Sequence, residues 1–423
     1  MGLPVRSFFG AVYKRARRFI SAAFLLFTQT HALDNGVAHL PVLGYNTWNA
    51  YQAAGYNYVN IDDCYSSHNR SDEGYIVENP DTFSRGMKNL TDTLHGLGFQ
   101  TGIYSDSGWL TCGGYPGSYG NEERDAQTFF VDWGFDYLKY DNCYIPFDSI
   151  TRTGIIGRYQ RMADAIANLT ADTNKPVVLS LCEWGWSQVW LWGKRFGQSW
   201  RTTGDIAPEW NSLAAIINTN SFITQATDFY GRNDLDMLQL GNGNLTYEES
   251  KSHFTAWALM KSPLLIGTDL STITNETLEI LTNSEILAIN QDAEVGESIS
   301  PFRWGINPDF VSNSTHPAQY WSGPTFNGTV FMLLNTLNEP ATLLFNLTES
   351  PWIVAGHQYS VRDLWAHTDN GVAVRNITQD DVPAHGVVAL LLQDAGDEPD
   401  DIYPPCSVWD QCADQDGTRI DLM

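Results

Sequence analysis

Tyr137-Leu-Lys-Tyr-Asp-Asn-Cys143 is a short apolar segment that ends in polar residues, and it is one of eight such segments between residues 42 and 290. Helical patterns separate these segments along the chain. Near-continuous apolar strands that alternate with helices are typical of a parallel sheet covered by helices. The predicted strands are Val42–Trp48, Tyr56–Asp63, Gln100–Asp106, Tyr137–Cys143, Val177–Trp184, Ser199–Ile206, Asp236–Leu240 and Leu264–Leu270.

Eight strands within about 250 residues predict an α/β fold of the (β/α)8 TIM-barrel type. A doubly wound sheet is the alternative, but the sequence lacks the glycine-rich phosphate-binding turn of that fold. The predicted helices are Thr91–Leu97, Asp125–Trp133, Ile156–Ala167, Leu213–Thr219, Tyr247–Met260 and Asn275–Ile289.

The pattern changes after the barrel, which we place at residues 33–297. Residues 298–395 hold short strand-like segments separated by Asn, Gly and Pro turns, so we expect an antiparallel β-sandwich domain there. Residues 396–423 are acidic and contain Pro404-Pro405 with a Cys406/Cys412 pair. We interpret them as a weakly ordered tail that could hold one local disulfide.

Residues 1–32 have the pattern of a secretory signal peptide. A basic stretch precedes the nine-residue apolar segment Phe19–Phe27, and small residues flank His31 in Thr30-His31-Ala32. An amphipathic helix is the alternative, and the apolar segment is too short to cross a bilayer. We therefore expect a secreted, extracellular protein that has no membrane attachment after cleavage.

Secretion permits glycosylation and disulfide bonds. Nine Asn-X-Ser/Thr sequons are present, at Asn69, Asn89, Asn168, Asn244, Asn275, Asn313, Asn327, Asn346 and Asn376.

Hydrophobic residues make up 43% of the chain, which is enough for a large core. The 24 basic and 49 acidic side chains give a net charge of −25. Because such a chain repels phosphate backbones, we expect no nucleic-acid partner.

Acidic residues stand at the ends of seven predicted strands, where a parallel barrel places its chemistry. Asp also ends strands and caps helices, which would explain about half of these positions. It does not explain Glu183, or the cations Lys139 and Arg201 among the carboxylates. The acidic residues at these ends are Asp62, Asp63, Asp106, Asp141, Glu183, Asp205, Asp234, Asp236 and Asp269.

A ring of carboxylates with few histidines indicates two chemistries. One is a site for a hard metal ion with oxygen ligands. The other is glycoside hydrolysis, which uses two carboxyl groups that flank a sugar. Aromatic residues at the same strand ends favour the sugar, and these are Trp48, Tyr104, Trp109, Trp184, Trp186 and Trp200.

The chain resembles glycoside hydrolase family 27, the α-galactosidases and α-N-acetylgalactosaminidases, and the secreted fungal α-galactosidases are the most similar. The resemblance covers Leu33 to Leu392 and is carried by four motifs in order. They are Gly55-Tyr-Asn-Tyr-Val-Asn-Ile-Asp-Asp-Cys64, Tyr137-Leu-Lys-Tyr-Asp-Asn-Cys143, Trp200-Arg201 with Gly204-Asp205-Ile206, and Asn233-Asp-Leu-Asp-Met237.

This resemblance implies that Asp141 is the nucleophile and Asp205 the acid/base of a retaining mechanism. The two carboxyl groups would then lie about 5–5.5 Å apart. Lys139 lies two residues before Asp141 on the same strand, so both side chains face the barrel mouth. The ammonium would keep Asp141 ionised, although a purely structural ion pair is the alternative. We expect burial, or the charges of Asp236 and Asp141, to keep Asp205 protonated.

The resemblance also implies a galactose-binding set. Trp48 would pack on the apolar face of the sugar, and Glu183 with Trp186 would exclude a 2-acetamido group. The remaining residues would hold sugar hydroxyl groups or line the pocket: Asp62, Asp63, Tyr104, Cys112, Lys139, Arg201 and Asp236.

Two features of the cysteines follow from the same comparison. Cys112 and Cys143 match a family disulfide at the mouth of the site, and Cys182 would be a buried free thiol. The family carries about thirty residues, including a full helix, between Trp48 and the second strand, whereas this chain has only Asn49–Gly55. We interpret this as a deletion that leaves Cys64 unpaired. We expect it to expose the flanks of the first two strands and to cost several kcal/mol of stability.

We therefore predict a retaining α-galactosidase that acts on terminal, non-reducing α-D-galactosyl units of oligosaccharides and galactomannans. No metal or other cofactor is implied. A non-catalytic galactose-binding remnant and an α-N-acetylgalactosaminidase are the alternatives. A metal enzyme with oxygen ligands is a further alternative, which the lack of a histidine cluster disfavours.

Overall fold

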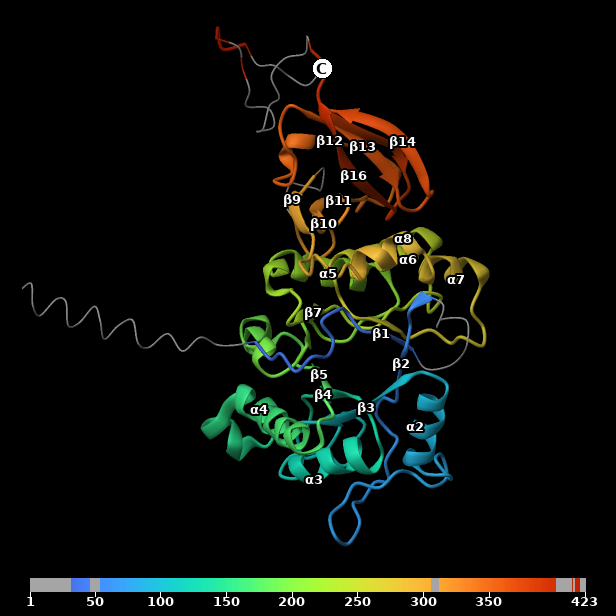
Figure 1. Ribbon diagram of the computed structural model, residues 1–423, viewed down its shortest axis with the longest axis vertical. Coiled ribbons are helices and arrows are strands. Elements are labelled where there is room, and N and C mark those ends of the chain that lie inside the picture. The colour runs from blue at the N-terminus through green and yellow to red at the C-terminus, as the bar shows by residue number, and fades with distance from the viewer. Residues whose placement is uncertain (1–31, 46–53, 306–311, 401–412, 414, 419–423) are drawn as a thin grey trace, which may run out of the picture. The chain divides into compact units, whose positions relative to one another are not determined.

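The computed structural model describes residues 32–45, 54–305, 312–400, 413 and 415–418 (Figure 1). Eight parallel strands form one sheet in the order β7-β6-β5-β4-β3-β2-β1-β8. A parallel bridge between Leu238 and Ile266 joins the segment after β7 to β8 and closes the barrel. The strands are β1 (Leu43–Tyr45), β2 (Tyr58–Asn60), β3 (Gln100–Asp106), β4 (Tyr137–Asp141), β5 (Val178–Leu181), β6 (Ser199–Arg201), β7 (Arg232–Asp234) and β8 (Leu264–Ile266). The predicted (β/α)8 architecture is confirmed.

Helices follow most of the strands, as the apolar periodicity predicts. α6 begins with a capping box in which Thr246 and Glu249 satisfy each other's backbone N–H groups. Its residues Phe254–Leu259 are all buried, because both the barrel and the second domain pack on it. The helices are α2 (Met87–Gly96), α3 (Glu122–Ala126), a π-helical turn (Gln127–Asp132), α4 (Phe147–Thr173), α5 (Trp210–Ser221), α6 (Tyr247–Leu259), α7 (Asn275–Leu281) and α8 (Ser284–Asn290).

The predicted seventh strand, Asp236–Leu240, is wrong, because β7 lies earlier, at Arg232–Asp234. All three residues of β7 are buried although they are polar. Asp236 has a φ of 82°, which ends the extended backbone there. Hydrophobic patterning missed β7 because the interior of the barrel is polar at this strand.

The short connection between β1 and β2 still joins two paired parallel strands, with Gly44 opposite Tyr58. Leu43 and Val59 are each 4% exposed, and Tyr56 is 1% exposed. The Tyr56 hydroxyl donates to the carbonyl oxygen of Leu281 at the end of α7, at 3.0 Å. The predicted exposure of these flanks is therefore wrong at these three positions. Residues 46–53, which include Trp48, lie outside the described part of the chain.

The C-terminal β domain contains a six-stranded antiparallel sheet, in the order β14-β13-β16-β11-β10-β9, and the pair β12-β15. The expected antiparallel sandwich is confirmed. The strand-like segments Val330–Leu334, Ala341–Leu347, Tyr359–Leu364 and Val387–Leu392 overlap β11, β12, β13 and β16, whereas the sequence pattern does not indicate β9, β10, β14 and β15. The pattern does not indicate β14 because its first four residues are Thr, Asp, Asn and Gly, and all four are exposed. The strands are β9 (Ser300–Arg303), β10 (Tyr320–Thr325), β11 (Gly328–Leu334), β12 (Ala341–Asn346), β13 (His357–Asp363), β14 (Thr368–Val374), β15 (Asn376–Val382) and β16 (Val387–Asp397).

One hydrophobic cluster contains residues of both domains, among them Trp257 of α6 and Trp321 and Met332 of the β domain. The signal-peptide residues and the Cys406/Cys412 pair lie outside the described residues. Within the described residues, no helix combines the length and hydrophobicity that a bilayer crossing needs.

The sequon asparagines lie mostly at the surface. Asn376 is half-buried, and seven others are exposed. Asn346 is only 5% exposed, and its side chain caps the 3-10 turn Leu347–Glu349. This position disfavours a glycan at Asn346 in the folded protein.

Candidate active site

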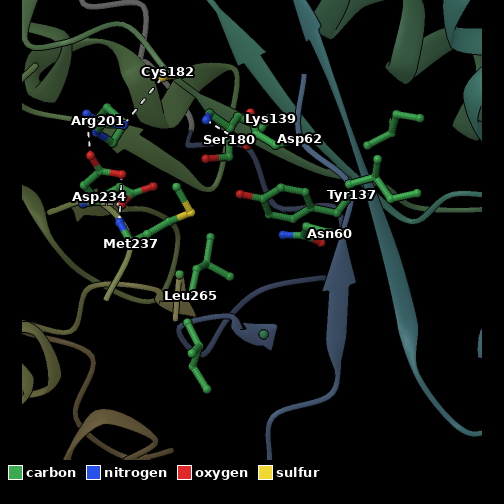
Figure 2. Close-up of a pocket in the computed structure, with 16 residues that line it drawn as sticks. Asn60, Asp62, Tyr137, Lys139, Ser180, Cys182, Arg201, Asp234, Met237 and Leu265 are labelled. Atoms are coloured by element: carbon green, nitrogen blue, oxygen red, sulfur yellow. Dashed lines mark hydrogen bonds and ion pairs between the residues drawn. The ribbon is translucent and has the colours of Figure 1, made fainter. Parts of the chain in front are cut away.

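A cavity of about 220 Å³ lies at the centre of the barrel, and each of the eight strands contributes to its lining (Figure 2). Its lining includes five polar residues that the sequence placed at strand ends: Asp62, Lys139, Cys182, Arg201 and Asp236. They come together because parallel strands in a barrel end at one mouth.

Asp141, the last residue of β4, is 6% exposed, and both of its carboxylate oxygens accept hydrogen bonds. The Asn142 backbone N–H donates to Oδ1 at 2.9 Å, and the Tyr104 hydroxyl donates to Oδ2 at 3.0 Å. Burial raises the pKa of Asp141, while Lys139 and the two hydrogen bonds act in the opposite direction. Burial, and then the charge of Asp141, raises the pKa of Tyr104, which therefore stays a donor.

Lys139 points into the cavity and forms an ion pair of 2.9 Å with Asp62 of the β2 end (Figure 2). Its ammonium also lies 5.2 Å from the centre of the Tyr104 ring. Burial alone would lower the pKa of Lys139, but nearby negative charges, Asp62 first among them, outweigh burial and raise it. The cavity therefore carries a fixed positive charge beside Asp141.

Arg201, at the end of β6, is 3% exposed and binds two carboxylates. Its Nη2 lies 2.8 Å from Asp236 Oδ2 and 3.1 Å from Asp205 Oδ1. The Asp236 side chain is buried, but that of Asp205 is 86% exposed. The burial expected around Asp205 is therefore absent, because the loop after β6 carries its side chain outward beyond Arg201.

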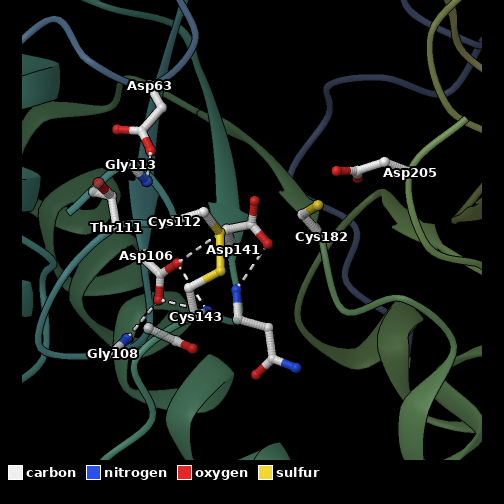
Figure 3. Close-up of a disulfide and its surroundings, with 12 residues drawn as sticks. Asp63, Asp106, Gly108, Thr111, Cys112, Gly113, Asp141, Cys143, Cys182 and Asp205 are labelled. Carbon is white, nitrogen blue, oxygen red and sulfur yellow. Dashed lines mark hydrogen bonds between the residues drawn. A yellow bond between two sulfur atoms is a disulfide. The ribbon is translucent and has the colours of Figure 1, made fainter. Parts of the chain in front are cut away.

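The disulfide between Cys112 and Cys143 joins the segments that follow β3 and β4, and confirms the predicted pairing (Figure 3). Asp106, at the end of β3, accepts hydrogen bonds from the Gly108 and Cys143 backbone N–H groups, and burial raises its pKa to about 8. A Cβ atom at Gly108 would lie 2.6 Å from the Tyr144 carbonyl oxygen, so only glycine permits this approach. In the view of Figure 3, Asp141 and Asp205 lie on opposite sides of Cys182.

Five described residues of the predicted binding set are not part of the cavity lining: Asp63, Tyr104, Cys112, Glu183 and Trp186. The Asp63 carboxylate accepts from the backbone N–H groups of Cys64 and Gly113, each at 2.7 Å. Glu183 is completely buried, and its oxygens have no hydrogen-bond partner within the described part of the chain. Trp186 is 58% exposed.

The structure adds residues that the sequence analysis did not single out as binding residues. Asn60 and Asp234, the last residues of β2 and β7, and Ser180, one residue before the end of β5, also line the cavity. Burial raises the pKa of Asp234 to about 6, although Arg201 acts against it. Asn60 and Ser180 face inward from predicted strands, so the two-residue period of those strands could have indicated them.

Two further cysteines of the described residues match their predictions, because Cys182 is a buried free thiol and Cys64 is free and exposed. Among the described residues, one group has the spacing of a metal site: Asp106, Cys112, Asp141 and Cys143. Both of its sulfur atoms are committed to the disulfide, which removes them as thiolate ligands.

A (β/α)8 barrel with carboxylates and two cations around a central cavity fits a glycoside hydrolase. Residues 42–292 match the family model described as alpha galactosidase A. Residues 315–392 match the model described as the alpha galactosidase C-terminal beta sandwich domain. The chain belongs to this alpha-galactosidase family.

Individual relatives agree with this assignment. A probable alpha-galactosidase B from Aspergillus fumigatus is 39% identical over 84% of this chain and 93% of its own length. The crystal structure of alpha-galactosidase I from Mortierella vinacea is 34% identical, with a TM-score of 0.78 over 87% of this chain and all of that one. An alpha-galactosidase from Saccharomyces cerevisiae, solved with raffinose, is 28% identical, with a TM-score of 0.72 over 85% of this chain and 99% of that one.

Proposed function

We propose that this enzyme hydrolyses terminal, non-reducing α-D-galactosyl units by double displacement, with Asp141 as nucleophile and Asp205 as acid/base. Asp141 Oδ attacks the anomeric carbon, and the glycosidic C–O bond breaks as Asp205 gives its proton to the leaving oxygen. Asp205 then takes a proton from water, whose oxygen displaces Asp141 from the sugar. The observation that carries the proposal is the Asp141 carboxylate, fixed by two hydrogen bonds beside the Lys139 ammonium.

The different environments of the two carboxyl groups fit their proposed roles. A nucleophile needs a fixed orientation, and buried Asp141 has one. An acid/base must exchange protons with the leaving oxygen and then with water, and exposed Asp205 is accessible to both.

Substrate recognition would rest on the polar groups around the cavity. Lys139 and Asp62 offer a donor and an acceptor to neighbouring hydroxyl groups of galactose, and Arg201 with Asp236 would bind near O2. A sugar that lacks an axial O4 would leave these polar groups without hydrogen-bond partners, so the site should discriminate strongly against it. We propose raffinose-type oligosaccharides and galactomannan side chains as substrates.

Secretion and glycosylation form part of the same proposal. Residues 1–32 would be removed as a signal peptide, and glycans would occupy accessible sequons such as Asn69, Asn89 and Asn168. The carboxyl groups at the site and the acidic composition suit an acidic working pH.

The proposal is tested by expressing residues 33–423 through a secretory route and measuring p-nitrophenyl α-galactoside hydrolysis at about pH 4–5. We expect activity in the wild type and its loss in Asp141→Asn, which keeps the shape of the side chain and removes its charge. A folded wild type that is no faster than Asp141→Asn contradicts the proposal.

The same preparation separates the alternatives. Galactose binding without turnover identifies a binding protein, and restoring a family-length insert after Tyr51 then tests whether the short connection is the cause. If the α-N-acetylgalactosaminide is turned over faster than the α-galactoside, the enzyme is an α-N-acetylgalactosaminidase. Loss of activity in a chelator supports a metal enzyme.

A further inference from the structure

Arg158 of α4 is one of the largest fully buried side chains of the described residues, at 1% exposure. Its guanidinium donates from Nη1 to Ser107 Oγ at 2.6 Å and from Nη2 to Asn142 Oδ1 at 2.7 Å. Ser107 directly follows β3, and Asn142 directly follows β4. One helix side chain therefore joins the ends of two neighbouring barrel strands.

Both partners of Arg158 are bonded to Asp141 as well. The Ser107 backbone N–H donates to the Asp141 carbonyl oxygen at 3.0 Å. The Asn142 backbone N–H donates to Asp141 Oδ1 at 2.9 Å. The guanidinium thus holds two residues that fix the backbone and the carboxylate of Asp141, although it does not touch Asp141 at ion-pair distance in the described structure.

The charge of Arg158 is also unusual. Within the described residues it has no carboxylate at ion-pair distance, and its Nε has no hydrogen-bond partner. Burying a guanidinium in this way costs free energy, and an apolar side chain of similar volume is often as stable or more so. An arginine at this position therefore needs an explanation beyond apolar packing, and its two hydrogen bonds to the residues beside Asp141 offer one.

We propose that Arg158 is a positioning residue for the nucleophile: it fixes Ser107 and Asn142 on the two sides of Asp141 and so holds its carboxylate in one orientation. This inference rests on the proposed role of Asp141. Burial raises the pKa of Glu183 to about 8, and the charge of Arg158 acts in the opposite direction. The next residue, Tyr159, donates to the Cys182 carbonyl oxygen at 3.2 Å, so this turn of α4 supports the end of β5 as well.

The test compares Arg158→Met and Arg158→Lys with the control Arg161→Met. Arg161 lies three residues further along α4 and makes two hydrogen bonds, of 2.7 and 2.9 Å, to Glu122 away from the site. The measurements are kcat for p-nitrophenyl α-galactoside, the inhibition constant of galactose, and the thermal midpoint of unfolding.

We expect Arg158→Met to lower kcat by about 10- to 100-fold, because a small displacement of the nucleophile carries a loss of this order. The inhibition constant of galactose should change little, since the sugar-binding groups Lys139, Asp62 and Arg201 are unaltered. Arg158→Lys should recover part of the rate, because it keeps the charge and can reach one of the two partners. Unchanged kcat in Arg158→Met overturns the proposal. So does a proportional loss of galactose binding, or an equal loss in Arg161→Met.

If Arg158→Met does not fold, Ser107→Ala and Asn142→Ala carry the test, since each removes one partner and leaves the guanidinium in place. Wild-type kcat in both variants overturns the proposal, and a lower kcat with wild-type galactose binding supports it. Asp141→Asn, measured in parallel, separates the two levels of inference. If Asp141→Asn keeps wild-type activity, the proposed role of Asp141 fails. If Asp141→Asn is inactive while the Arg158 variants are fast, only the positioning role fails.

Discussion

The hydroxyl of Tyr104 donates a hydrogen bond of 3.0 Å to Oδ2 of Asp141, from the neighbouring strand of the barrel. The other carboxylate oxygen accepts from the Asn142 backbone N–H, so each oxygen of Asp141 is held by its own donor. β3 and β4 pair in parallel with Tyr104 opposite Lys139. This register therefore brings the Tyr104 phenol, the Lys139 ammonium and the Asp141 carboxylate close together. The following predictions test what this group and its neighbours do.

The pH dependence of turnover at acidic pH should follow the ionisation of the Asp141 carboxyl group. Burial raises its pKa and Lys139 opposes that shift, so Asp141 loses its charge as the pH falls through the raised value. Replacing Lys139 with Met removes the opposing charge and raises the pKa further. We expect the acidic limb of the kcat/KM profile to move to higher pH in Lys139→Met. Lys88→Met on the surface of α2 is the control, and an unmoved limb in Lys139→Met contradicts this prediction.

The loss of activity in Asp205→Ala should depend on the leaving group of the substrate. Without a proton donor, a substrate with a poor leaving group such as raffinose should lose about 10²–10⁴-fold in kcat/KM. The p-nitrophenyl glycoside should lose less, because its phenolate leaves without protonation. Initial rates on both substrates check this, with Asp228→Ala, which removes a surface partner of Lys194, as the control. Equal losses on both substrates would argue against Asp205 as the acid.

Stability should decrease as the pH rises because of Glu183. Burial raises its pKa to about 8, so the folded protein binds this proton more tightly than the unfolded chain does. The favourable contribution is complete below the unfolded value, near pH 4.5, and is lost as the pH rises toward 8. Glu183→Gln, which cannot ionise, should therefore gain thermal stability over the wild type at pH 8 and gain less at pH 4.5.

Thermal unfolding of both proteins at the two pH values is the measurement. Glu279→Gln, a substitution of an exposed residue of α7, should behave as the wild type at both. A difference between Glu183→Gln and the wild type that does not change with pH contradicts the prediction.

Removing the Cys112–Cys143 disulfide should affect stability and rate together. The bridge closes a chain segment with a sequence separation of 31, for which loop entropy gives about 3–4 kcal/mol of stabilisation. The double variant Cys112→Ser with Cys143→Ser should unfold at lower denaturant concentration. It should also turn over more slowly, because the Cys143 N–H holds Asp106 beside Asp141.

Denaturant midpoints and kcat of the double variant check this prediction. Cys64→Ser, which removes a free thiol and breaks no bridge, is the matched control. An unchanged midpoint in the double variant would show that the two loops are held by other contacts.

The sequence predicted the barrel well where strands were apolar. Gln100–Asp106 was predicted with the bounds that β3 has, because its residues after Gln100 are buried on both faces of the sheet. β7 was misplaced because Arg232, Asn233 and Asp234 are buried polar residues that hydrophobic patterning reads as loop. Arg158 was not recognised, because one arginine in a helical pattern normally indicates the solvent face.

Local pattern by itself determined the architecture and the residue types at the mouth. Alternating strand and helix periods specify a parallel barrel, and such a barrel collects Asp141, Lys139, Arg201 and Asp236 at one end. Only the tertiary structure decided which of these residues meet. It buried Asp141 and Glu183, left Asp205 exposed, and placed Arg158 behind the nucleophile. The physical reason is that burial and hydrogen-bond pairing arise from loop paths and from contacts between residues as far apart as Ser107 and Arg158, 51 positions in sequence, which no local period encodes.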